Sequence, residues 1–96
     1  MSPNKEPLTS GQLERALASL TSWTVEAGKL HRELKFRDFV DAFGFMSKVA
    51  ILAESLNHHP EWSNVYNTVI IDLRTHEVAG ISELDIDLAT RIDGVA

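Results

Sequence analysis

The chain has 96 residues, which allows one domain and leaves no room for two. Hydrophobic residues make up 44% and charged residues 24%, a globular balance that argues against disorder and fibrous repeats. The net charge of −5 argues against a broad basic surface for nucleic acid. Without cysteine, the chain has no disulfide framework, thiolate metal site or thiol nucleophile. No apolar stretch approaches the ~20 residues needed to span a bilayer, so we expect a soluble cytoplasmic protein.

Residues 1–8 hold two of the three prolines and little apolar content, so we expect a flexible N-terminal leader before one domain at 9–96. Thr9 and Gln12 have the spacing of a capping box at the start of a helix. That helix is predicted to run for about three turns and to end at Thr21–Ser22. Its apolar stripe consists of Leu13, Leu17 and Leu20.

A hairpin is predicted next, with Trp23–Glu26 and Leu30–Phe36 flanking a tight turn at Ala27–Gly28. Apolar and polar residues alternate with period 2 in the second segment, which is typical of a strand with one buried face. Arg32 interrupts the apolar row, and His31 falls on the polar face.

The following helix is predicted to begin at Asp38 or Asp41 and to end at about Leu56. It carries two apolar stripes, whereas the surface helix of a monomer needs only one. We therefore expect the second stripe to meet another subunit, in a homodimer or homotetramer built through the 38–56 helix. The first stripe is Phe39, Phe43, Met46, Ala50 and Ala53; the second is Phe45, Val49, Leu52 and Leu56, of which Phe45, Val49 and Leu52 are expected to touch the neighbour.

The second half of the chain begins with a loop, Asn57–Trp62, restricted by Pro60. Asn64–Thr75 is rich in β-branched residues, and its alternation fits either one long strand or two strands bent at Asn67–Thr68. A capping box of Ser82 and Asp85 then predicts a last helix that stops near Gly94, with Ile81 opposite Ile86 as a hydrophobic staple. This order of elements predicts a two-layer α+β domain with helices on one face of an antiparallel sheet.

Three of the four histidines gather near predicted strand ends. His58 and His59 precede Pro60, and His76 follows the last strand. Imidazole exchanges protons near neutral pH, so the cluster predicts general acid–base chemistry. Glu54 lies one helical turn before His58, where it can orient a ring or stabilise its charge. Trp23 and Trp62 are candidates for a flat wall beside a ring-shaped ligand.

A metal site is the competing interpretation of three histidines. Zinc sites often use two histidines at i and i+4, whereas neighbours at i and i+1 seldom point at one ion. Only Glu54 and Glu61 supply carboxylates nearby in the sequence. We therefore expect no metal.

The run Glu54–Asn67, with its H-H-P-x-W motif, is followed by Thr75–Glu77 and Ala79–Ser82. Together these segments resemble the pterin-4a-carbinolamine dehydratase family, also known as the dimerisation cofactor of a hepatocyte nuclear factor. The resemblance covers Leu13 to Ile92. It implies a four-stranded antiparallel sheet backed by helices, and therefore two strands between residues 64 and 75. It also implies dimers that pair into tetramers through the long helix.

The implied reaction is dehydration of 4a-hydroxytetrahydrobiopterin to quinonoid dihydrobiopterin, which recycles the cofactor of aromatic amino acid hydroxylases. By resemblance, His58 and His76 are the acid–base pair, His59 mainly holds the pterin and Glu54 supports the imidazoles. No redox change occurs, so no cofactor is implied. The resemblance also implies substrate contacts from Asn57, Pro60, Arg74, Thr75 and Glu77, and places Trp23 and Asp85 as supporting residues.

Two positions depart from the animal members of this family, which usually have aspartate at the position of Asn57 and arginine at that of Leu84. Loss of the aspartate charge bears on the pH optimum, and loss of the arginine bears on substrate affinity. Two other functions stay open. The resemblance permits a transcriptional coactivator that binds the dimerisation helices of a homeodomain protein, which would also be nuclear. It also permits a cofactor-free hydratase for another heterocycle.

Overall fold

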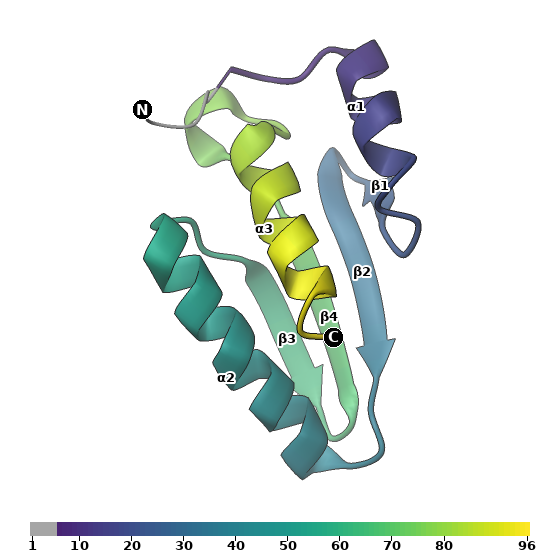
Figure 1. Cartoon of the computed structure of the whole chain (residues 1–96), viewed down its shortest axis with the longest axis vertical. Coiled ribbons are helices and arrows are strands. Elements are labelled where there is room, and N and C mark those ends of the chain that lie inside the picture. Colours follow the sequence, from purple (N-terminus) through teal and green to yellow (C-terminus); the bar gives the residue numbers. More distant parts are fainter. Residues whose placement is uncertain (1–5) are drawn as a thin grey trace.

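The computed structural model describes residues 6–96. They form the predicted α+β domain, in which α2 and α3 lie over one side of an open four-stranded antiparallel sheet (Figure 1). The elements are α1 (Ser10–Leu17), β1 (Thr24–Glu26), β2 (Lys29–Lys35), α2 (Phe39–Leu56), β3 (Glu61–Val65), β4 (Thr68–Leu73), the 3₁₀ turn η1 (His76–Val78) and α3 (Glu83–Asp93).

Most of the predicted leader lies outside the described residues, but its last residue belongs to the folded domain. The Leu8 amide donates to the Ile81 carbonyl at 2.9 Å, and its side chain packs against the core. The Thr9–Gln12 capping box is confirmed, although α1 ends at Leu17 and not at the predicted Thr21–Ser22. Leu20 is still buried, because two successive turns after the helix carry it into the core.

The sheet has the strand order β1-β2-β4-β3. The turn at Ala27–Gly28 is confirmed, with φ values of 52° and 75° that suit a tight two-residue hairpin. Residues 64–75 do not form one strand, since the chain reverses between Val65 and Thr68. The predicted loop is shorter than expected, because β3 already begins at Glu61, opposite Asp72 of β4.

The core lies between the sheet and the two helices α2 and α3. Leu30 of β2 pairs with Leu73 of β4, and both side chains are fully buried. Arg32 breaks this apolar row, as the sequence indicates, and is accommodated because its guanidinium pairs with Asp93 at the end of α3, at 2.6 Å. The indole of Trp23 donates to the same carboxylate at 2.8 Å.

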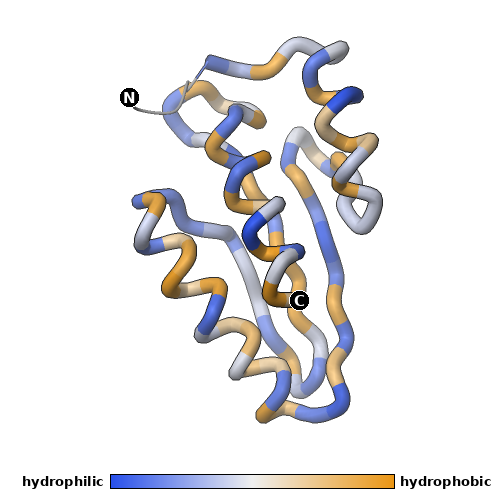
Figure 2. The backbone as a smooth tube through the Cα atoms, in the orientation of Figure 1, coloured by the Kyte–Doolittle hydropathy of each residue, from blue (hydrophilic) through white to orange (hydrophobic). Residues whose placement is uncertain are grey.

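The orientation of α2 corrects the predicted subunit contact. Phe45 and Val49 are buried in the core of the chain itself, and Leu52 is partly buried against the same core, so this stripe meets the sheet and not a neighbour. Figure 2 shows that α2 is hydrophobic over much of its length. A helix can turn only one face to the sheet, and the face left exposed includes only part of the other predicted stripe, because Val40 and Ile51 belong to neither stripe. Its exposed large apolar residues are Phe39, Val40, Phe43 and Ile51.

No helix in residues 6–96 combines the length and the apolar character that crossing a membrane requires.

Candidate active site

The most enclosed histidine is His58, which lies just after α2. Its Nε2 atom is 2.6 Å from Oδ1 of Asp85, on the first turn of α3, although the two residues are 27 positions apart. Asp85 is fully buried and His58 nearly so. The short contact fixes the orientation of the ring and assigns Nε2 to the carboxylate, which leaves Nδ1 for other partners.

Asp85 is itself held by its surroundings. Its Oδ2 atom accepts hydrogen bonds from the Thr75 hydroxyl, at 2.8 Å, and from the Ser82 amide, at 2.9 Å. The Thr75 and Ser82 hydroxyls are 2.6 Å apart. The capping box predicted for α3 therefore has a second role, because the carboxylate that caps the helix also holds an imidazole.

The chain reaches His58 through a change of backbone direction at Asn57. Asn57 ends α2 in the left-handed conformation, with φ 49° and ψ 41°. Asparagine adopts this conformation more readily than most residues, since its short polar side chain lowers the steric cost. The next amide, from His58, donates to the Ala53 carbonyl at 3.0 Å and so closes the helix end.

The other two histidines are exposed, and each lies beside a different carboxylate. His59 Nε2 is 2.8 Å from Oε1 of Glu54, so the carboxylate expected to serve the imidazoles contacts His59 and not His58. His76 begins η1, and its Nε2 atom is 3.2 Å from Oε2 of Glu61. The loop that carries His76 is closed by a bridge between Thr75 and Gly80.

The three histidines line one cavity of about 330 Å³. This volume is at the lower end of the range for small-molecule pockets. The cavity lies where the α2–β3 connection meets η1. Its lining residues are Asn57, His58, His59, Pro60, Glu61, His76 and Glu77.

Several predicted site residues lie outside this lining. Thr75 is fully buried, and its hydroxyl donates a hydrogen bond to Asp85. Arg74 is partly buried, and its Nε atom is buried without a hydrogen-bond partner within residues 6–96. Trp23 is part of the core near the end of α3 and does not line the cavity. Trp62 faces α2, where it lines a small cavity with Phe43 and Met46.

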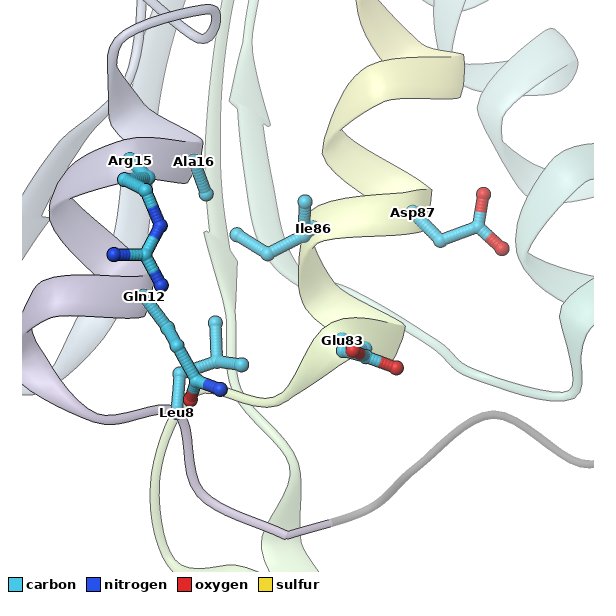
Figure 3. Close-up of a pocket in the computed structure, with 7 residues that line it drawn as sticks. All are labelled: Leu8, Gln12, Arg15, Ala16, Glu83, Ile86 and Asp87. Atoms are coloured by element: carbon cyan, nitrogen blue, oxygen red, sulfur yellow. The ribbon is translucent and has the colours of Figure 1, made fainter.

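A second cavity of about 410 Å³ lies between α1 and α3 (Figure 3). Leu8, Ala16 and Ile86 supply its apolar surface, and Arg15 lines it from α1, with its side chain lying along that helix toward Gln12. No histidine lines it. Imidazoles that exchange protons near neutral pH therefore line the first cavity and not this one.

Metal ligation was the competing use of the histidines. Within residues 6–96, no three His, Cys, Asp or Glu side chains have the arrangement of a metal-binding group. The rings instead contact three separate carboxylates, from Glu54, Glu61 and Asp85.

Glu61 was predicted only as a possible metal ligand, and Lys29 was not predicted to belong to the site. The Lys29 ammonium is 2.5 Å from Oε1 of Glu61, across the intervening strand β4. A strand predicted to begin three residues earlier, at Glu61 and not at Asn64, would have included Glu61. The contact with Lys29 depends in addition on the strand order, which residue spacing does not reveal.

Comparison with known proteins gives the same family as the sequence motifs. The model of the family described as pterin 4 alpha carbinolamine dehydratase matches residues 6–95. A relative from Solibacter usitatus, named for pterin-4-alpha-carbinolamine dehydratase, is 52% identical over 89 residues, or 93% of this chain and 94% of that protein. A relative of the same name from Prochlorococcus marinus MIT 9303 is 54% identical over 86 residues, or 90% of each chain.

A solved structure agrees with these relatives. The crystal structure of a protein from Brucella melitensis, described as a transcriptional coactivator/pterin dehydratase, superposes with a TM-score of 0.91 at 43% identity. The match covers 95% of this chain and 99% of that one. The chain therefore belongs to the pterin-4-alpha-carbinolamine dehydratase family of hydro-lyases.

Proposed function

We propose that this chain dehydrates 4a-hydroxytetrahydrobiopterin to quinonoid dihydrobiopterin and water by histidine general acid–base catalysis. The reaction recycles the tetrahydrobiopterin cofactor of aromatic amino acid hydroxylases, and we expect it in the cytoplasm. The observation that carries the proposal is a single cavity lined by three imidazoles, each beside a different carboxylate. Family membership supports the substrate class.

The reaction needs two proton transfers and no change of oxidation state. The C4a–O bond breaks as an acid protonates the departing hydroxyl, which leaves as water. A base removes the proton from the neighbouring ring nitrogen, whose electron pair forms the C=N bond. An imidazolium and a neutral imidazole near neutral pH supply both partners, and each such group contributes about 10²–10⁴-fold.

We assign the two transfers to His58 and His76, and we assign His59 mainly to holding the substrate. His58 is supported by its bond to Asp85, which fixes the ring and leaves Nδ1 free to exchange a proton. Asn57, Pro60 and Glu77 are proposed to contact the pterin because they line the cavity.

Arg74 is proposed to contribute a further substrate contact. Its Nε atom is a buried donor without an acceptor in residues 6–96. Buried polar groups are usually hydrogen-bonded, so an acceptor supplied by the ligand would remove this deficit.

The test of the function is a turnover assay with the purified protein and 4a-hydroxytetrahydropterin, against the uncatalysed rate. Replacing His59 with Ala should mainly raise KM. Treatment with EDTA should leave the rate unchanged. Turnover equal to the uncatalysed rate would overturn the proposal, and a loss in EDTA restored by zinc would overturn its metal-free mechanism.

We also propose that the chain self-associates through the exposed face of α2. Val40, Phe43 and Ile51 are 75%, 58% and 71% exposed, more apolar surface than one helix normally presents to water. We expect a homotetramer at micromolar concentration. Light scattering should show a smaller assembly for Phe43→Glu, while Val25→Glu, an exposed apolar position on β1, should keep the native mass. A native mass near 10.7 kDa would contradict the assembly.

A coactivator role is the second candidate function. It is favoured by the same α2 face and by the description of the Brucella melitensis relative. The proposed partner is the dimerisation helices of a homeodomain protein, without direct contact to nucleic acid. A protein that acts only in this way would turn over no pterin.

A further inference from the structure

A chain of charged side chains runs from the edge of the histidine cavity across the open face of the sheet. Oε2 of Glu61 is 3.2 Å from His76 Nε2, and Oε1 of the same carboxylate is 2.5 Å from Lys29 Nζ. Lys29 is on β2 and Glu61 on β3, so the ammonium reaches the carboxylate across β4.

We propose that Glu61 is a positioning residue for His76, and that Lys29 holds Glu61 in place for that task. The catalytic part of this inference rests on the proposed function, in which His76 exchanges a proton with the substrate. A carboxylate at Nε2 favours the tautomer that carries its proton there, and Nδ1 is then the nitrogen left for the substrate.

The geometry distinguishes this arrangement from an ordinary surface ion pair. The two oxygens of Glu61 are divided between two partners, so the carboxylate bridges the lysine and the imidazole. Glu61 also lines the cavity, and it lies at the first position of a strand rather than in a free loop. Side chains held on a strand keep their geometry better than side chains in loops.

The charge state of Glu61 supports the same role. The hydrogen bond from Lys29 holds the pKa of the Glu61 carboxyl below its ordinary value, against an opposing effect of desolvation. The charges of Lys29, His76 and Arg74 lower it further. Glu61 is therefore an anion across the neutral range in which the histidines work.

The kinetic test compares substitutions at both ends of the bridge. Glu61→Gln keeps the shape but removes the charge, and it should lower kcat about tenfold with little change in KM, less than the 10²–10⁴-fold of an acid–base group itself. Lys29→Met should lower kcat about two- to fivefold, the scale of an exposed ion pair. Lys29→Arg should restore most of that loss.

Matched controls lie on the same face of the sheet. Glu33→Gln and Lys35→Met remove the same charges from exposed positions of β2, and both should leave kcat unchanged. In the double variant, Lys29→Met should add nothing to Glu61→Gln, because the lysine acts through the carboxylate. Additive losses would overturn the role of Lys29.

A readout independent of activity is the ¹⁵N NMR spectrum of the His76 ring, assigned by comparison with His76→Gln. The fraction of neutral His76 rings protonated at Nε2 should be higher in the native protein than in Glu61→Gln, and Glu33→Gln should keep the native fraction. An unchanged tautomer, or an unchanged kcat in an active enzyme, would overturn the proposal. If the protein proved inactive, the proposed function would fail, and the tautomer would still decide whether Glu61 positions the ring.

Discussion

Two imidazole–carboxylate pairs each contribute a histidine to the cavity, and they are built in opposite ways. The His58–Asp85 pair is buried, and Thr75 and Ser82 bind its carboxylate from the other side. In the His76–Glu61 pair the imidazole is exposed and the carboxylate is partly exposed, and within residues 6–96 only Lys29 anchors that carboxylate through a hydrogen bond. One pair is part of the packing of the domain, and the other is part of its surface.

Because the two pairs differ in burial, substitutions in them should differ in their effects on the stability of the fold and on turnover. A buried carboxylate that loses one partner keeps its desolvation penalty, so changes in the first pair should affect folding as well as turnover. An exposed carboxylate is stabilised by water when its partner is removed, so changes in the second pair should affect turnover alone. Substitutions in the two pairs can therefore test the comparison directly.

The largest effect is expected for Asp85→Asn. The carboxylate of Asp85 accepts hydrogen bonds at both oxygens. In the variant, an NH₂ group replaces one oxygen and meets a group that can only donate, and His58 loses its anionic partner. We expect unfolding in urea to show a loss of about 3 kcal/mol, together with a fall in kcat.

The matched control is Asp87→Asn on the outer face of α3, where the carboxylate pairs with Arg91. That change should alter the free energy of unfolding by less than about 0.5 kcal/mol. Glu61→Gln should likewise leave stability nearly unchanged while lowering kcat. Equal losses of stability in the Asp85 and Asp87 variants would show that burial does not distinguish the two pairs.

A smaller effect is expected for Thr75→Val, which keeps the shape of a fully buried side chain but removes its hydroxyl. Asp85 would lose one of its donors, and Ser82 would lose its hydroxyl partner. The expected loss is about 1–3 kcal/mol in urea unfolding. Thr90→Val, at an exposed position of α3, serves as the control, and an equal loss there would reject the role of the buried network.

The smallest effect concerns a third pair, His31 and Asp72, on the face of the sheet away from the helices. The hydrogen bond to Asp72 raises the pKa of His31 above its ordinary value, although burial opposes the rise. This stabilisation is complete below about pH 6.5 and is lost as the pH rises through the higher pKa of the folded state.

Urea unfolding between pH 5.5 and 9 should therefore show a modest decline in stability on the alkaline side, and Asp72→Asn should flatten it. Asp38→Asn, which removes a carboxylate at the start of α2, should retain the decline. The same slope in the native protein and in Asp72→Asn would mean that this pair does not couple folding to protonation.

Local signals in the sequence predict much of this fold. The capping boxes at Thr9 and Ser82 and the turn at Ala27–Gly28 depend on residues a few positions apart, and all three are confirmed. The division of residues 64–75 into two strands needed the family resemblance, because alternation continues through a tight turn.

The remaining features depend on contacts between distant segments. The sequence of α2 does not reveal which of its two apolar stripes meets the sheet, and the stripe predicted for the subunit contact is the one that packs in the core. Similarly, Asp85 was assigned a supporting role by resemblance, but its contact with His58 exists only because α3 packs beside the end of α2. The bridge from Lys29 to Glu61 requires the strand order, which spacing along the chain does not determine.

The central claim is that His58 and His76 together perform the proton transfers. The most direct test measures turnover of 4a-hydroxytetrahydropterin by His58→Ala, His76→Ala and the double variant, with folding of each checked by circular dichroism. Each single change should lower kcat by about 10²–10⁴-fold, and the folded double variant should not exceed the uncatalysed rate. A folded double variant that keeps the turnover of the native protein would contradict the account.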